Sequence, residues 1–154
     1  RAYQEEQEKR KKLEAATVSY AQPGQMQNER DFNQQGEESQ PVQLRGRHGR
    51  RAVRWFSFDM TVDPTHPMTV MVTFSNDERR ARSFSILLDG VRIGEHKIDR
   101  RSPEKEIYFY EAEYAVPLEL TRNKKKVTLR FEAKADSETA AVYGIRIVRT
   151  VLVP

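Results

Sequence analysis

The chain has 154 residues, the length of one folded domain, and its 37% hydrophobic and 32% charged residues exclude a fully disordered chain. The 27 basic residues barely exceed the 23 acidic ones, so the net charge of +4 does not by itself indicate a nucleic-acid partner. Cysteine is absent, which excludes disulfides, thiolate zinc sites and cysteine nucleophiles.

Residues 1–16 predict a linker helix. Nearly all residues from Ala2 to Ala16 are good helix formers, and Glu5 and Lys9 have the spacing of a stabilising ion pair. The apolar residues form no continuous stripe, so most of this helix is expected to stay in solvent. Because the chain starts with a charged helix and without methionine, we expect it to be part of a longer polypeptide, with residues 17–154 as the β-sandwich domain.

Residues 17–49 are the least regular part of the sequence. Their composition shifts to Gln, Asn, Gly, Glu and Ser, which favours long loops with short strands around Val18 and Val42. Irregular segments of this length in a domain are usually functional or mobile, so we expect only partial order here. A basic segment, residues 45–54, follows, and we interpret it as a basic loop that leads into a strand.

After Arg50 the hydrophobic pattern has a period of two, which is typical of half-buried strands. In residues 51–62, Phe56, Phe58 and Met60 share the face that we expect to point inward, and Trp55 lies on the other face. A turn with two prolines follows, and residues 68–74 repeat the alternation. The sequence therefore predicts two core strands in succession.

The clearest local signal is a β-hairpin around Asp89-Gly90. This dipeptide favours the positive φ angles of a two-residue type I′ turn. With these two residues as the loop, we expect Leu88 to lie opposite Val91 and Ile86 opposite Ile93, with both pairs on one face.

Further alternating segments follow at residues 107–116, 127–133 and 143–147. Six to eight short strands with no helical pattern between them predict an all-β fold, an antiparallel two-layer β-sandwich of jelly-roll type with the N-terminal linker helix. A barrel is the structural alternative.

No reactive cluster stands out in the sequence. The three histidines are far apart, and none has the spacing that places two metal ligands on one face, so we expect no metal site. Glu111 and Glu113 alternate within one segment, which favours a solvated strand face over a glycosidase pair. No hydrolase, phosphate-binding or dinucleotide motif occurs, so we expect no enzyme in this chain. No apolar run approaches the roughly 20 residues that span a bilayer, so no membrane partner is expected.

Aromatic and basic side chains provide the candidate contact residues. An indole or a row of tyrosines could stack on a sugar, although packing against the N-terminal helix, a loop or a neighbouring domain is the favoured interpretation. Arginines bind carboxylates and phosphates, but basic runs in a balanced chain are usually solvated or ion-paired. The candidates for glycan or interdomain contact are Trp55, Tyr108, Tyr110, Tyr114, Arg47 and Arg54.

Several segments, taken in order, resemble one known module. They are residues 13–19, 23–29, 31–39, 51–58, 82–90 and 142–146. Together they are similar to the C-terminal β-sandwich of bacterial β-L-arabinofuranosidase-type glycosidases, which have an α/α-barrel catalytic domain. That resemblance implies a zinc-bound cysteine and glutamates in the barrel, chemistry that this cysteine-free chain cannot carry. Where the family often has an aromatic-rich strand, residues 72–76 read Val-Thr-Phe-Ser-Asn, so a ligand role for that strand is not expected.

These observations favour a non-catalytic accessory domain of a secreted glycoside hydrolase. It would pack on or orient the catalytic domain of the same polypeptide and contact plant polysaccharide, and the resemblance implies a periplasmic or extracellular location. The first alternative is an independent carbohydrate-binding module. The second is a nucleic-acid-binding β domain that uses the basic loop 45–54, although we expect no nucleic-acid partner. No cofactor is expected, but structural calcium stays open because backbone carbonyl ligands leave no trace in a sequence.

Overall fold

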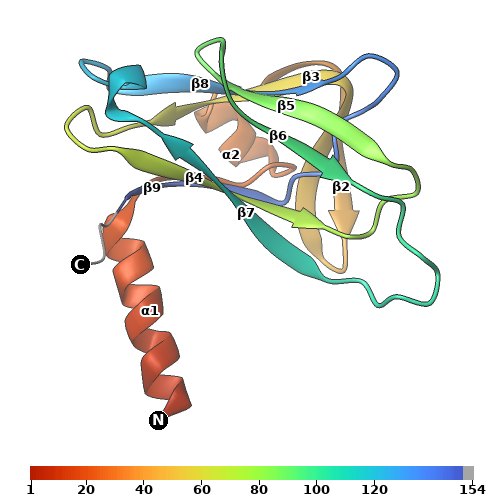
Figure 1. Cartoon of the computed structure of the whole chain (residues 1–154), viewed down its shortest axis with the longest axis horizontal. Coiled ribbons are helices and arrows are strands. Elements are labelled where there is room, and N and C mark those ends of the chain that lie inside the picture. The colour runs from red at the N-terminus through yellow and green to blue at the C-terminus, as the bar shows by residue number, and fades with distance from the viewer. Residues whose placement is uncertain (151–154) are drawn as a thin grey trace.

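Two antiparallel sheets face each other in the computed structural model, which describes residues 1–150 (Figure 1). The four-stranded sheet has the order β1-β9-β4-β7, and the five-stranded sheet has the order β2-β3-β8-β5-β6. The strands are β1 (Thr17–Ala21), β2 (Gln35–Leu44), β3 (Arg47–Thr61), β4 (Met68–Ser75), β5 (Arg82–Leu88), β6 (Val91–Ile98), β7 (Phe109–Val116), β8 (Lys126–Ala133) and β9 (Gly144–Arg149). The helices are α1 (Ala2–Ala16), α2 (Met26–Asp31) and the 3-10 turn η1 (Leu118–Leu120).

The core lies between the inner faces of the two sheets. Phe56, Phe58 and Met60 of β3 are fully buried, as their alternation predicts, and Phe56 stacks on Phe131 of β8 with ring centroids 4.9 Å apart. Alternate residues of β4 fill the opposite layer. Burial of each such side chain contributes roughly 1.5–3 kcal/mol, which drives the layers together. The predicted all-β sandwich is confirmed, and the barrel alternative is wrong because the strands form two separate sheets.

The β5–β6 hairpin has the predicted turn, but one predicted pair is wrong. Asp89 and Gly90 have φ angles of 48° and 83°, and Leu88 lies opposite Val91. Ile86, however, lies opposite Gly94, because a β-bulge beside Ile86 shifts the register by one residue. The bulge places Gly94 against the ring of Tyr114 in the other sheet, where a Cβ would overlap the ring.

Residues 17–49 are much more regular than their composition predicts. They form β1, α2 and β2, so the predicted strands around Val18 and Val42 are confirmed, whereas the prediction of long loops is wrong. β2 is an edge strand with mostly exposed side chains, so it is held by backbone hydrogen bonds to β3 and needs little hydrophobic alternation. The prediction of a basic loop at residues 45–54 is also wrong. Arg45 and Gly46, both with positive φ, form the turn of the β2–β3 hairpin, and the remaining residues belong to β3.

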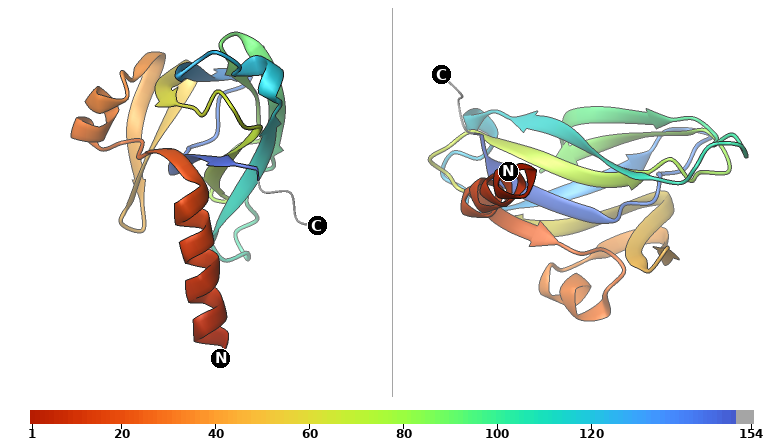
Figure 2. Two further views of the ribbon diagram at one scale, coloured as in Figure 1. Left: turned by 90° about the vertical axis from the view of Figure 1, so that its left-hand side faces the viewer. Right: turned by 90° about the horizontal axis from the view of Figure 1, so that it is seen from below.

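The helix α1 projects away from the sandwich (Figures 1 and 2). None of its residues is buried, which agrees with the predicted solvated helix. Its C-terminal end is fixed by Thr17, whose Oγ1 donates a hydrogen bond to the Leu13 carbonyl and accepts one from Arg146 of β9. The linker role of this helix and the boundary between residues 16 and 17 stay predictions. No helix within residues 1–150 is long and apolar enough to cross a bilayer.

Candidate functional site

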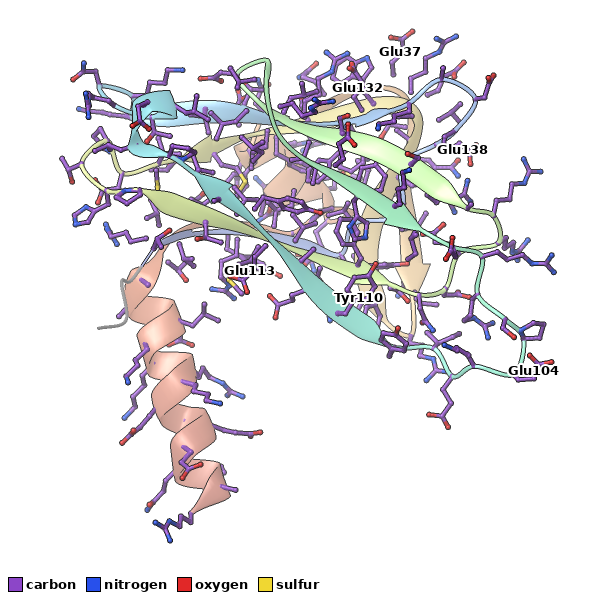
Figure 3. The ribbon with its side chains drawn as sticks, in the orientation of Figure 1. Glu37, Glu104, Tyr110, Glu113, Glu132 and Glu138 are labelled. Carbon is purple, nitrogen blue, oxygen red and sulfur yellow. The ribbon has the colours of Figure 1, made fainter. Side chains whose placement is uncertain are left out.

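A groove with a volume of 540 Å³ lies on the outer face of the five-stranded sheet, over β2, β3 and β8. We call it the Trp55 groove, because it contains the only tryptophan of the chain. The other lining residues are Glu37, Glu38, Val53, Arg54, Arg130, Glu132 and residues 133–137. Figure 3 shows Glu37 and Glu132 together on this side of the molecule. The groove thus places one large aromatic ring among carboxylates and guanidinium groups.

Trp55 is held by polar side chains from both neighbouring strands. Its indole Nε1–H donates a hydrogen bond to Oε2 of Glu37 on β2, 3.1 Å away. The Arg130 guanidinium of β8 lies 4.0 Å from the ring centroid and also donates a hydrogen bond to Glu132. The strand register explains this arrangement, because Trp55 lies directly opposite Glu37 and Glu132. Arg130 covers one face of the indole, so a stacking ligand has to use the other face.

A second groove lies on the outer face of the four-stranded sheet, beside the end of α1, and has a volume of 280 Å³. We call it the Arg47 groove. Its lining residues are Leu13, Tyr20, Arg47, Met71, Thr73, Phe109, Tyr110, Glu111, Gly144 and Arg146. Arg47 lies 4.5 Å from the centroid of the Phe109 ring, and Arg146 lies 4.7 Å from that of Tyr20. Each of these rings therefore also has an arginine on one face.

The three candidate tyrosines near β7 do not form one outward platform. Tyr110 and Tyr114 lie opposite Phe74 and Val70 of β4 on the inner side of the sheet, whereas Tyr108 is 53% exposed. Tyr110 and Tyr114 therefore pack against the core between the sheets, and not against the N-terminal helix or an outer loop. Contact of Tyr108 with a glycan or another domain stays a prediction.

Between the two sheets, His96 of β6 links both inward tyrosines. Its Nε2 lies 2.8 Å from the Tyr110 hydroxyl and its Nδ1 3.2 Å from the Tyr114 hydroxyl. Its ring stacks on Phe74 at 4.2 Å. Burial lowers the pKa of His96 and raises the pKa of Tyr110 to about 12. This cluster is therefore neutral near pH 7 and closes the edge of the sandwich between β6 and β7.

The basic segment 45–54 is largely neutralised by carboxylates. Arg50 pairs with the buried Glu29 at 2.6 Å. Arg51 pairs with the buried Glu78 at 3.2 Å, and Arg54 with the exposed Glu38 at 3.5 Å. The arginines of this segment also divide between the two outer faces of the sandwich, because Arg54 lines the Trp55 groove and Arg47 lines the other groove. The segment therefore does not form one free basic surface.

Comparison with known proteins places the chain in a family. The model of a family of unknown function, DUF6805, matches residues 12–148, which include nearly all of the sandwich. The chain belongs to this family. No curated protein sequence matches the chain significantly.

Solved structures similar to this member of DUF6805 share its sandwich fold. A family 35 carbohydrate-binding module from Clostridium thermocellum has a TM-score of 0.54 and 9% identity, over 77% of this chain and 93% of that one. A CBM36 module in complex with calcium and xylotriose has a TM-score of 0.53 and 11% identity, over 84% of this chain and 99% of that one. An exo-β-1,3-galactanase from Phanerochaete chrysosporium has a TM-score of 0.57 and 10% identity, and 86% of this chain spans 29% of the galactanase. At these identities the likeness shows a common fold.

Structural calcium bound through backbone carbonyl oxygens stays a prediction. Within residues 1–150 no group of three or more His, Asp or Glu side chains could hold a metal ion. The buried carboxylates of Glu29 and Glu78, which would be natural calcium ligands, are each paired with arginine. In this DUF6805 chain, arginine therefore compensates the buried acidic charge.

Sequence reasoning missed the residues that hold Trp55. Alternation in β8 places Arg130 and Glu132 on the outer face, because Leu129 and Phe131 point inward. Their contact with Trp55 depends on which strand pairs with β3, and that cannot be inferred from alternation. Glu111 and Glu113 are exposed on β7, as predicted, and Glu111 lines the Arg47 groove.

Proposed function

We propose that this chain is a non-catalytic accessory domain of a secreted glycoside hydrolase and that it binds glycan in the Trp55 groove. The observation that carries this proposal is the fixed indole of Trp55 in a groove lined by charged side chains. Ring faces of sugars stack on aromatic side chains, and sugar hydroxyls hydrogen-bond to carboxylate and guanidinium groups. Glu37, Arg54 and Glu132 supply such groups beside the indole.

Pre-organisation of the indole favours binding. The hydrogen bond to Glu37 and the stacked Arg130 hold the ring in one orientation before a ligand arrives. A ring that is already ordered loses little conformational entropy on binding, so more of the stacking energy contributes to affinity. The common fold with carbohydrate-binding modules is compatible with this role.

The accessory role rests on the resemblance to the C-terminal module of β-L-arabinofuranosidase-type glycosidases. The catalytic domain of the same polypeptide would then be the partner, with a periplasmic or extracellular location. The Arg47 groove lies beside α1 and includes Leu13, so it is the surface that a domain linked through that helix would meet first. The Trp55 groove lies on the opposite sheet and stays open to glycan.

The test is isothermal titration of the domain with arabinose-containing oligosaccharides and with xylo-oligosaccharides. We expect binding by the wild type and about tenfold weaker binding by Trp55→Ala, because aromatic stacking contributes about 0.5–1.5 kcal/mol beyond area burial. Trp55→Phe keeps a ring and is expected to retain part of the affinity. Arg47→Ala alters the other face and is expected to bind as the wild type does.

Two results would contradict the proposal. Equal affinity of Trp55→Ala and the wild type, with an unchanged thermal midpoint, would place the glycan elsewhere on the domain. No heat with any glycan would leave only the packing role, which co-purification with the catalytic domain of the same polypeptide measures.

A further inference from the structure

A second hollow adjoins the Trp55 groove on the same side of the sandwich. It has a volume of 750 Å³ and shares Glu38 and Val53 with the Trp55 groove. We call it the arginine hollow. Its remaining lining residues are Ser39, Gln40, Arg51, Ala52, Arg79, Arg80, Arg82 and Glu138. Val53 is 48% exposed between the two depressions, so one extended ligand can lie across both.

Two of the four arginines in this hollow are neutralised within the protein. Oε1 of Glu78 accepts hydrogen bonds from Arg82 at 2.9 Å and from Arg51 at 3.2 Å. Arg82 also pairs with Glu138, which lines the hollow. Figure 3 shows Glu138 on the same side of the molecule as Glu37 and Glu132. Two guanidinium groups thus meet two carboxylates, and their charges cancel.

Arg79 and Arg80 are not compensated in this way. Both are exposed, and neither forms a salt bridge or a side-chain hydrogen bond with any residue between 1 and 150. They follow directly after Glu78, whose carboxylate also accepts a hydrogen bond from the Ala141 backbone N–H at 3.0 Å. The carbonyl of Glu78 accepts a further backbone hydrogen bond from Arg101. The connection between β4 and β5 is therefore anchored at Glu78, and it presents two free positive charges at the hollow.

We propose that the arginine hollow binds the anionic group of an acidic glycan whose neighbouring sugar rings lie along Trp55. This inference rests on the proposed glycan-binding function and adds the substrate class. Arginine binds planar or tetrahedral oxyanions through paired N–H donors, and a uronate carboxylate and a sulfate ester both provide such oxygens. A uronate and a sulfated sugar therefore present the same recognition group, an oxyanion on a sugar ring.

Nucleic acid fits this surface less well. A nucleic acid carries a negative charge on every phosphate, so its backbone would also pass the carboxylates of Glu37, Glu38 and Glu132 in the Trp55 groove. An acidic glycan needs an anion only where Arg79 and Arg80 lie, and its hydroxyls can hydrogen-bond to the carboxylates. The alternation of acidic and basic groups along the surface therefore favours the glycan.

The experiment compares one polymer in three forms: glucuronoxylan, in which neutral xylose units separate the uronate branches, the same polymer after reduction of its carboxyl groups, and the reduced polymer after sparse sulfation. Affinity is measured with the full chain for the wild type, for Arg79→Ala/Arg80→Ala and for Lys11→Ala/Lys12→Ala. The last variant removes the same charge from the exposed side of α1. We expect the wild type to bind glucuronoxylan about tenfold more tightly than the reduced polymer, because only the uronate can accept charge-assisted hydrogen bonds from Arg79 and Arg80.

The arginine variant is expected to bind both polymers as the wild type binds the reduced one, whereas the lysine variant keeps the full difference. If the wild type binds the sulfated polymer more tightly than the reduced one, the oxyanion site is supported, and a sulfate ester is a second group that can occupy it. Equal wild-type affinity for the charged and reduced polymers, a difference that survives in the arginine variant, or tighter binding of a single-stranded oligonucleotide would overturn the inference. Binding of the reduced polymer that depends on Trp55 would still support the proposed function in those cases, so the two failures are distinguishable.

Discussion

The two outer faces of the sandwich use the same local contact in different surroundings. On the five-stranded sheet Arg130 covers Trp55, and on the four-stranded sheet Arg47 covers Phe109. Trp55 has a polar N–H that Glu37 fixes, and it lies in a groove of 540 Å³. Phe109 has no such group, packs edge-on against Tyr143 and lies in a groove of 280 Å³ beside α1. An arginine over an aromatic ring thus does not define a binding site. The neighbouring polar groups and the space around the ring decide whether the ring can bind a ligand.

The largest expected loss of stability follows removal of Glu78, which lies on the side of the five-stranded sheet. Glu78 is 3% exposed and holds Arg51 and Arg82 beneath the arginine hollow. We expect Glu78→Ala to lower the free energy of unfolding by about 3–5 kcal/mol, because it removes the buried carboxylate that pairs with both Arg51 and Arg82. Urea denaturation measures this loss.

The matched control for that variant is Glu132→Ala, which breaks the half-exposed pair with Arg130. It is expected to cost less than about 1 kcal/mol. A loss of similar size in both variants would mean that Glu78 does not anchor the connection between β4 and β5.

A smaller perturbation tests the arginine and aromatic contacts directly. We expect Arg130→Ala and Arg47→Ala each to lower the free energy of unfolding by about 0.5–1 kcal/mol, because each removes a cation–π contact at a partly exposed site. Only Arg130→Ala is expected to change the intrinsic tryptophan fluorescence, because Trp55 is the only tryptophan and lies on that face. An emission shift in Arg47→Ala would contradict the independence of the two faces.

The smallest expected effect concerns the edge where the two sheets meet. Burial lowers the pKa of His96 below its usual value of 6.5, so the unfolded chain binds this proton more readily than the folded one does. The stability that His96 contributes is therefore present above pH 6.5 and lost as the pH falls through 6.5 toward the lower folded pKa. The facing Tyr110 and Tyr114 stay neutral in this range, since burial raises their pKa.

Thermal melts between pH 7.5 and pH 5.5 measure this effect. The midpoint of the wild type is expected to fall by a few degrees over the interval, and His96→Gln is expected to flatten that part of the profile. An unchanged slope in His96→Gln would assign the pH dependence to other groups.

Prediction from the sequence succeeded where the signal is local. The inward face of β3, the Asp89-Gly90 turn and the solvated helix α1 follow from side-chain alternation, from the conformations that a dipeptide favours and from helix propensity. In residues 17–49 the strands around Val18 and Val42 were predicted correctly, but the full length of β2 was missed, because an edge strand can be polar on both faces and still pair through its backbone. The prediction also failed at Ile86, where a bulge that no sequence pattern marks shifted the register.

The candidate site divides in the same way. The sequence by itself determined that the chain has no cysteine chemistry, that Trp55 points away from the core and that alternating strands build a sandwich. Only the tertiary structure decided that Glu37 and Arg130 hold the indole, that Tyr110 and Tyr114 turn inward, and that Arg79 and Arg80 lie free beside the groove. The physical reason is that alternation is a property of one strand, whereas contacts between side chains depend on strands paired across long stretches of sequence, whose order the core packing selects.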